Sequence, residues 1–264
     1  MVYFSGLSDA ARITFFQMMV ISIIAMVIFV VGLIINFQKW GAGVTGYALE
    51  PEAGSKGSAV RFLKTWWKQV TAKSEHGHGK PILEILILDI LFQRRILKRS
   101  PGRWFMHFTI FAGWMTLFAM SGMMFTVEMA EMFVELPISA EQFREFLQLP
   151  NDIFGYILLL GVLIALVRRI FVKEVRDSSI TYDWVLIGVL FLVTVSGFVA
   201  DGIRTGDLIW NIGMSGETAR AYAPPAALFH SVISLLFCIA YIPYSKYIHV
   251  IATPLAILAN KGGE

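Results

Sequence analysis

The chain has 264 residues, of which 56% are hydrophobic and only 16% are charged, and its mean hydropathy is +0.66. An ordinary soluble domain carries about 25% charged residues, so the composition excludes that class and indicates a chain folded in a lipid bilayer. The formal net charge is +3, which we attribute to a basic face that meets anionic lipid headgroups. No nucleic-acid partner is expected.

Five apolar stretches are long enough to cross a hydrocarbon core of about 30 Å at 1.5 Å per helical residue. They are residues 13–37, 105–127, 153–171, 184–200 and 226–241. We therefore expect an all-α protein of the cell membrane, a multi-pass bundle of five transmembrane helices. No basic region precedes the first stretch and no small-residue cleavage site follows it, so we expect a transmembrane helix there and not a signal peptide.

The charges of the loops predict the orientation of these helices. Lys and Arg are concentrated between the first two stretches and directly after the third, whereas the loop after the second stretch is rich in Glu. Loops rich in Lys and Arg stay in the cytoplasm. The N-terminus is therefore predicted to lie outside and the C-terminus in the cytoplasm.

Residues 38–103 form a long cytoplasmic insertion between the first two crossings. After a Gly-rich link, apolar and basic side chains alternate at helical spacing from 58 to 70, which predicts an amphipathic helix in the headgroup region. The apolar run 82–92 is too short to span the bilayer and is expected to lie against protein on the cytoplasmic side. The insertion is either a docking surface for a soluble partner or a lipid-facing strap.

Two capping signals stand before the third crossing. Ser139, with Gln142 three residues later, predicts a capping box for a short helix that ends near Leu147. Asn151 is then placed to cap the third crossing itself.

Several chemistries are not encoded in the sequence. Cys238 is the only cysteine, so the chain by itself can hold neither an iron–sulfur cluster nor an internal disulfide. The usual Gly-rich phosphate loops and the His-Glu-x-x-His metal motif are missing as well. His76 and His78 lie in a Gly-rich turn and are expected to be solvated.

Three histidines lie at membrane level, where an imidazole is costly unless its lone pair or proton has a partner. The predicted topology puts His107 and His249 near the cytoplasmic ends of the second and fifth crossings, where they can face each other. His230 lies in the outer half of the fifth crossing, roughly 28 Å from His249 along an ideal helix, with Pro243 between them to bend it. Histidines that only relay protons or form hydrogen bonds are the alternative, as in a haem-free anchor or a transporter.

The asymmetry of the three histidines predicts two unlike haems. The outer level of the second crossing, 117–125, contains no histidine. An inner haem held by two imidazoles would be low-spin, and an outer haem held by His230, alone or with a weaker sixth ligand such as methionine, would be high-spin.

Two sequence elements resemble a known family of membrane cytochromes. They are Arg-Trp-Phe-Met-His at 103–107 and Tyr-Ile-Pro-Tyr-Ser-Lys-Tyr-Ile-His at 241–249, and they are similar to the five-crossing cytochrome b family that includes the gamma subunit of respiratory nitrate reductase. The stretches Trp-Gly-Ala-Gly-Val-Thr-Gly-Tyr-Ala-Leu-Glu from Trp40 and Leu-Phe-Gln-Arg-Arg-Ile-Leu from Leu91 make nearly the whole chain resemble a narrower family. It comprises the cytochrome b subunits, or E subunits, of the membrane-bound heterodisulfide reductases of methanogenic archaea.

The resemblance implies a single dihaem cytochrome b domain over residues 1–264, with two b haems. His107 and His249 match the inner ligand pair and His230 matches one outer ligand. This chain departs from the nitrate reductase pattern at Leu117, which stands where that family has the second outer histidine. A low-spin and a high-spin haem are therefore expected together.

The resemblance also implies the reaction and the partner. Dihydromethanophenazine, a lipid-soluble carrier, would be oxidised near the outer haem, its protons would leave outward, and its electrons would pass through both haems. The acceptor would be the cytoplasmic iron–sulfur catalytic partner, the D subunit, which reduces the CoM-S-S-CoB heterodisulfide. This chain would hold no disulfide-reducing site.

Two further groups of residues are candidates under this hypothesis. Asp201, Arg204 and Trp210, before the fifth crossing, are candidates for the carrier site. The candidates to neutralise propionates of the inner haem are Arg99, Arg103 and Lys246. A quinol-oxidising cytochrome b subunit of a sulfite-reducing or nitrate-reducing type of complex is the closer alternative.

Overall fold

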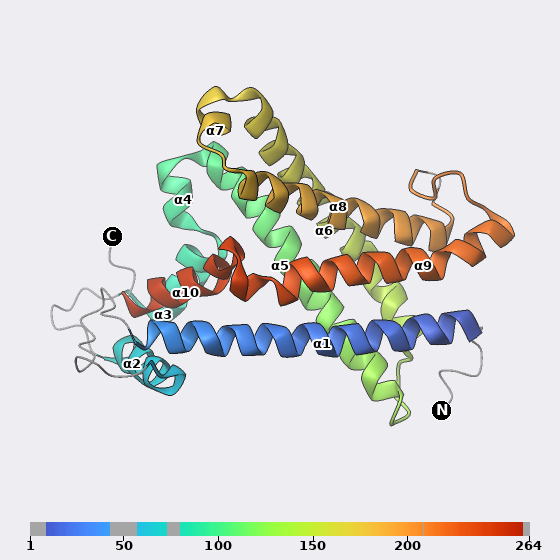
Figure 1. The fold of residues 1–264 in the computed structure, drawn as a ribbon, viewed down its shortest axis with the longest axis horizontal. Helices are drawn as coiled ribbons and strands as arrows, with labels where there is room; N and C mark the ends of the chain where they lie inside the picture. Colours follow the sequence, from blue (N-terminus) through green and yellow to red (C-terminus); the bar gives the residue numbers. More distant parts are fainter. Residues whose placement is uncertain (1–8, 43–56, 73–79, 208, 261–264) are drawn as a thin grey trace. The chain divides into compact units, whose positions relative to one another are not determined.

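The computed structural model describes residues 9–42, 57–72, 80–207 and 209–260, and within these ranges the chain contains helices and no strand. Five helices are long and apolar enough to cross a membrane. They are α1 (Asp9–Trp40), α5 (Pro101–Glu131), α6 (Ala140–Phe171), α8 (Thr181–Thr205) and α9 (Gly216–Leu235), which the π-helix η2 (Leu236–Ala240) continues (Figure 1). The predicted all-α, five-span, multi-pass membrane protein is confirmed.

The chain divides into two compact units. The first contains residues up to Ile21 and residues 102–234, so it holds the start of α1 together with α5, α6, α8 and α9. The second contains residues 22–101 and 235–264. The rest of α1, the insertion and the end of the chain therefore belong to the second unit.

Glycines bring the helices of the first unit close together. An ideal Cβ at Gly113 of α5 would lie 2.7 Å from the Leu158 Cβ of α6, and one at Gly155 of α6 would lie 2.8 Å from the Phe198 ring of α8. Apolar solvent gives little force for helix association in a membrane, so small residues that allow close backbone approach are the usual interface. These two contacts join α5 to α6 and α6 to α8.

The start of α1 contacts both α5 and α9 within the first unit. Ser231 of α9 donates a hydrogen bond of 3.4 Å to the Met18 sulfur. Phe15 and Met19 are buried against the end of α5, where the partly buried partners are Phe125, Met129 and Met132. Successive contacts therefore run from α9 through α1, α5 and α6 to α8.

Helix α6 confirms one capping prediction and contradicts two others. Ser139 and Gln142 form the predicted capping box. The short helix ending near Leu147 and the cap at Asn151 are wrong, because α6 runs without interruption from Ala140 to Phe171 with Pro150 inside it. A proline removes one backbone donor, a loss that membrane helices tolerate, so one proline does not end this helix.

The insertion folds onto protein within the second unit. It consists of α2 (Ala59–Thr71), α3 (Ile82–Glu84), the π-helix η1 (Ile85–Leu91) and α4 (Arg94–Arg99). The predicted amphipathic helix is therefore confirmed. Trp66 of α2 donates its indole N–H to the Leu255 carbonyl of α10 (His249–Ala259) at 2.8 Å, and Ile85 is fully buried. Most of the predicted Gly-rich link, 43–56, lies outside the described residues.

A network of charges closes the end of η1. The Asp89 side chain is 1% exposed and accepts a hydrogen bond of 2.9 Å from Arg94 Nε. The other end of the Arg94 guanidinium donates to Glu84 at 3.1 Å, and these two carboxylates raise the Arg94 pKa. Gln93, between η1 and α4, has a left-handed backbone with φ of 51°. The sharp turn into α4 thus brings Arg94 back onto the buried carboxylate.

Arg94→Ala should lower the free energy of unfolding, because it leaves the buried Asp89 carboxylate with only the more distant Lys80 ammonium, 3.9 Å away. Detergent-induced unfolding of the purified chain measures this. Lys98→Ala, an exposed change on the same helix α4, is the matched control and should leave the midpoint unchanged. Equal midpoints for the two variants would contradict the proposed role of the pair.

Candidate functional site

His230 lies in the first unit on α9 and faces α8. Its Nδ1 is 3.0 Å from Ser196 Oγ, and the same oxygen lies 2.9 Å from the Val193 carbonyl. Its Nε2 lies 3.5 Å from Ser234 Oγ, and the Val193 carbonyl is a further hydrogen-bond partner of the ring. The imidazole also lies on the backbone of Gly197, since an ideal Cβ there would be 2.9 Å from Cε1 of the ring.

His249 lies in the second unit, and the chain reaches it through tight turns. After η2 come two 3₁₀ turns, η3 (Ile242–Tyr244) and η4 (Lys246–Ile248), and His249 then begins α10. The expectation of one bent helix from His230 to His249 is therefore wrong, because the chain leaves the helical path after Ala240. Pro243, in η3, marks the break.

The second half of α1 holds this turn within the second unit. Asn36 donates to the Pro243 carbonyl at 2.8 Å, and Tyr244 donates to the Ile28 carbonyl at 3.3 Å. Gly32 makes room for the turn, since an ideal Cβ there would lie 2.6 Å from the Pro243 ring. The Pro-Tyr-Ser-Lys element is thus a turn that packs against α1 and is held there by these hydrogen bonds.

The turn also orients the His249 ring. Its Nδ1 lies 2.5 Å from the Lys246 carbonyl three residues earlier. A carbonyl oxygen can only accept a hydrogen bond, so Nδ1 carries the proton and the neutral ring has its lone pair on Nε2. The His249 side chain is exposed, and its role as an axial ligand remains a prediction.

His107 lies in the second turn of α5 and is half-buried. Thr109, two residues later, is buried on the side where α5 meets α6, since its hydroxyl would lie 2.5 Å from a Cβ at Gly161. Two residues turn a helix by about 200°, so His107 lies on nearly the opposite face. Leu117 is half-buried ten residues further along α5.

The three histidines are divided between the two units. His107 and His230 belong to the first and His249 to the second, and the pairing of His107 with His249 remains a prediction. Among the described residues, no three His, Cys, Asp or Glu side chains gather as a metal ion bound by protein alone would require. A haem needs only one or two axial ligands from the protein. His76 and His78 lie outside the described residues.

The basic residues predicted for the inner haem lie at element ends. Arg103 is in the first turn of α5, four residues before His107 and so on the same face of the helix. Arg99 ends α4 and Lys246 begins η4. All three side chains are exposed.

The residues predicted for the carrier site come together at the end of α8. Arg204 donates to Asp201 at 2.6 Å. The Trp210 ring stacks on Phe198 with centroids 4.9 Å apart, and its indole N–H donates to Tyr156 of α6 at 2.8 Å. Sequence reasoning missed Tyr156 and Phe198, because their link to Trp210 depends on how α6 and α8 pack.

These three rings form one aromatic cluster, which we define as Tyr156, Phe198 and Trp210. Phe198 is buried between the other two and lies 4.5 Å from the Tyr156 centroid. Tyr156 is 46% exposed, so the cluster presents an aromatic ring at the surface of the first unit. Asp152, one turn before Tyr156, interacts electrostatically with Asp201 and Arg204.

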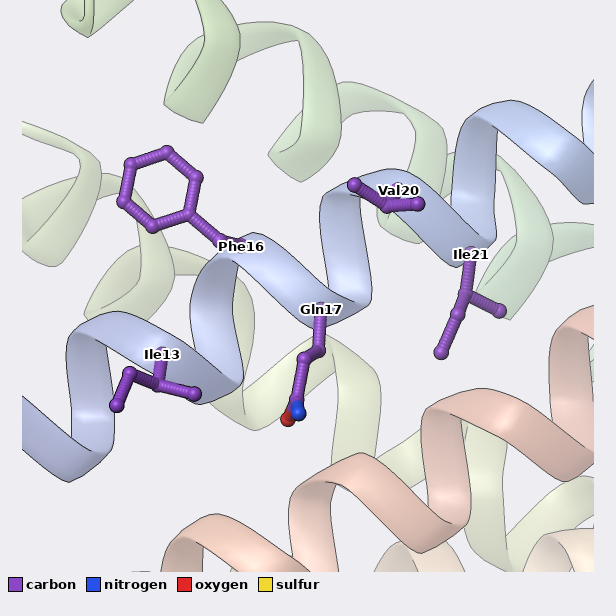
Figure 2. A pocket seen from close by; sticks show the side chains of 5 residues that line it. All are labelled: Ile13, Phe16, Gln17, Val20 and Ile21. Atoms are coloured by element: carbon purple, nitrogen blue, oxygen red, sulfur yellow. The ribbon is translucent and has the colours of Figure 1, made fainter.

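A shallow hollow of about 390 Å³ lies elsewhere on the first unit, along α1. Figure 2 shows that its five lining side chains all come from this one helix; they are Ile13, Phe16, Gln17, Val20 and Ile21. Four of the five are apolar, and none is a histidine or an acid. We therefore assign the hollow to the lipid-facing surface.

The chain is similar to characterised proteins over its whole length. Residues 83–257 match the family model of the E subunit of dihydromethanophenazine:CoB–CoM heterodisulfide reductase. The proteins of that name from Methanosarcina acetivorans and Methanosarcina mazei are 76% and 74% identical, cover 100% of this chain, and are themselves covered to 98% and 100%.

A more distant relative has a different name. The Hdr-like menaquinol oxidoreductase cytochrome b-like subunit of Archaeoglobus fulgidus is 25% identical over 87% of this chain and 74% of its own length. No solved structure shows significant similarity. Because the high identity extends over the full length and five helices can span a membrane, the chain belongs to the family of heterodisulfide reductase E subunits, the membrane component of an oxidoreductase complex.

Proposed function

We propose that this chain oxidises dihydromethanophenazine in the membrane and delivers the electrons to a cytoplasmic iron–sulfur partner, the D subunit, which reduces the CoM-S-S-CoB heterodisulfide. The name shared by the high-identity relatives supports both the carrier and the final acceptor. The single cysteine, Cys238, supports the division of labour, because disulfide reduction by thiols or an iron–sulfur cluster needs more ligands than this chain has.

The observation that carries the proposal is the hydrogen bonding of the His230 imidazole. His230 has Nδ1 beside the Ser196 hydroxyl and Nε2 at the limit of a hydrogen bond from Ser234, which makes Nε2 the nitrogen for a metal. His249 likewise has an oxygen acceptor beside Nδ1. A histidine that binds a metal almost always donates its other ring N–H in this way. These residues fit haem, and the cytochrome b-like relative supports that cofactor.

Two b haems would be held by three histidines, His107 with His249 at the inner level and His230 at the outer one. When bound, they supply one-electron transfer between a two-electron carrier and the partner. Arg99, Arg103 and Lys246 would neutralise propionates of the inner haem by charge-assisted hydrogen bonds.

The outer end of α8 would receive the carrier. The aromatic cluster offers flat rings on which a planar tricyclic molecule can stack. Asp201 would accept a proton from the carrier, and Arg204, its ion-pair partner, would hold the carboxylate in place. Release of protons outward, with electrons moving inward, would separate charge across the membrane.

A menaquinol-oxidising subunit is the second candidate, and the name of the Archaeoglobus relative favours it. The purified complex should oxidise dihydromethanophenazine and leave menaquinol essentially unoxidised, because the high-identity relatives all have the former in their name. Stopped-flow haem reduction by each donor measures this. Faster reduction by menaquinol would replace the proposed donor.

His107→Ala and His249→Ala should each abolish the low-spin haem spectrum and leave a high-spin signal, because each removes one of two imidazoles from the same iron. Absorption and electron paramagnetic resonance spectra of the purified chain show both signals. Leu163→Ala, an exposed change on α6, is the control. If both histidine variants keep the full low-spin band, the pairing is wrong, and if wild type shows no haem bands at all, the chain is a haem-free anchor or transporter.

His230→Ala should remove the high-spin signal, leave the low-spin haem intact and reduce carrier oxidation to background, because the outer iron loses its protein ligand. Turnover with reduced phenazine as donor measures the loss, and the low-spin band reports that the bundle is still folded. Unchanged turnover would contradict the place given to His230.

A further inference from the structure

The Ser196 hydroxyl lies between the Val193 carbonyl and the His230 ring. A serine has one hydroxyl hydrogen, and two groups lie within hydrogen-bond distance of Oγ, the Val193 carbonyl at 2.9 Å and His230 Nδ1 at 3.0 Å. A helical serine commonly donates its hydroxyl hydrogen to a backbone carbonyl of the preceding turn, and the Val193 carbonyl is in place for this. With that donation Oγ accepts from His230, which places the ring proton on Nδ1.

The lone pair of His230 is therefore on Nε2, and little competes for it. Ser234 Oγ lies 3.5 Å away, at the limit of a hydrogen bond. Ser234 is in a helix, where a serine can turn its hydroxyl to the carbonyl four residues earlier. An electron-pair acceptor at Nε2 thus displaces a weak contact, whereas one at Nδ1 would break the bond to Ser196.

Gly197 fixes where the ring lies. An ideal Cβ at this position would be 2.9 Å from Cε1 and 3.4 Å from both ring nitrogens. A Cβ atom is essentially never closer than 3.0 Å to a heavy atom of a non-neighbouring residue. Alanine at position 197 would therefore push the ring away from α8. Gly188 on the same helix has nothing within 4 Å of its ideal Cβ, so an alanine there would not move the imidazole.

We propose that Ser196 and Gly197 are positioning residues that together form the seat of His230. Gly197 lets the imidazole lie flat on α8, and Ser196 holds the tautomer that offers Nε2 as an axial ligand. This inference rests on the proposed function, in which His230 binds the outer haem.

The test uses five variants of the full complex: Ser196→Ala, Gly197→Ala, Ser234→Ala, Gly188→Ala and His230→Ala. Two readouts do not depend on turnover, namely the high-spin haem signal and the rate at which haem is lost to excess apomyoglobin. The low-spin band of the inner haem reports folding in every variant.

Ser196→Ala should lose its high-spin haem about tenfold faster than wild type, since loss of the hydrogen-bond partner of a metal-binding histidine weakens metal binding about 10- to 100-fold. Ser234→Ala should match wild type. Gly197→Ala should lose its high-spin haem faster than Gly188→Ala, because only the first new methyl group forces the imidazole to move; equal rates for the two would refute the role of Gly197.

The results distinguish the positioning role of Ser196 and Gly197 from the assignment of His230 as a haem ligand. If His230→Ala loses the high-spin haem but Ser196→Ala behaves like wild type, the seat is refuted and the proposed ligand stands. Faster loss in Ser234→Ala than in Ser196→Ala would also refute it, because the iron would then be on Nδ1. If His230→Ala itself keeps the high-spin haem, the ligand assignment in the proposed function fails.

Discussion

An imidazole at membrane depth must satisfy two ring nitrogens without water, and this constraint governs the candidate site. His230 and His249 meet half of the requirement with protein atoms and do so by different local structures. His230 uses a serine on a neighbouring helix, and His249 uses a backbone carbonyl exposed by a 3₁₀ turn. In both cases the oxygen lies beside Nδ1 of the ring. The same ring nitrogen is therefore oriented by two unrelated local structures.

Helix α8 connects the proposed carrier site with His230. Ser196 and Asp201 are five residues apart, about 7.5 Å along the axis at 1.5 Å per residue. Between them Phe198 stacks on Trp210, and Gly202 allows the Trp210 backbone to approach, since an ideal Cβ there would lie 2.5 Å from the Trp210 Cβ. A carrier stacked on the aromatic cluster would therefore be oxidised close to the outer histidine, with the Asp201 carboxylate beside it. Helix α8 thus contributes Gly197 to the seat of His230, and Phe198 and Gly202 to the packing of the aromatic cluster.

The sequence predicts those features that depend on local pattern. Five long apolar stretches, the capping box at Ser139 and the amphipathic helix α2 are each determined by neighbouring residues, and they form as expected. The break after Ala240 depends on Gly32 and Asn36, which lie far earlier in the chain, so the sequence around Pro243 could only indicate a bend. Gly197 and Gly188 look alike in the sequence, and only the approach of α9 distinguishes them. The histidines were found from residue type and depth, whereas the partners that orient them come from other helices or from an unpredicted turn.

Within the second unit, the insertion is built onto the helix that begins with His249. Trp66 of α2 donates to the Leu255 carbonyl in α10, six residues after that histidine. The turn that precedes α10 is held by its hydrogen bonds to α1, and the later part of α10 is held by α2. A soluble partner bound to the insertion would therefore contact elements joined directly to the inner imidazole, and movement of α2 would be transmitted to α10. The insertion thus belongs to the same unit as the basic residues Arg99 and Lys246, and its two predicted roles, docking surface and lipid-facing strap, both remain predictions.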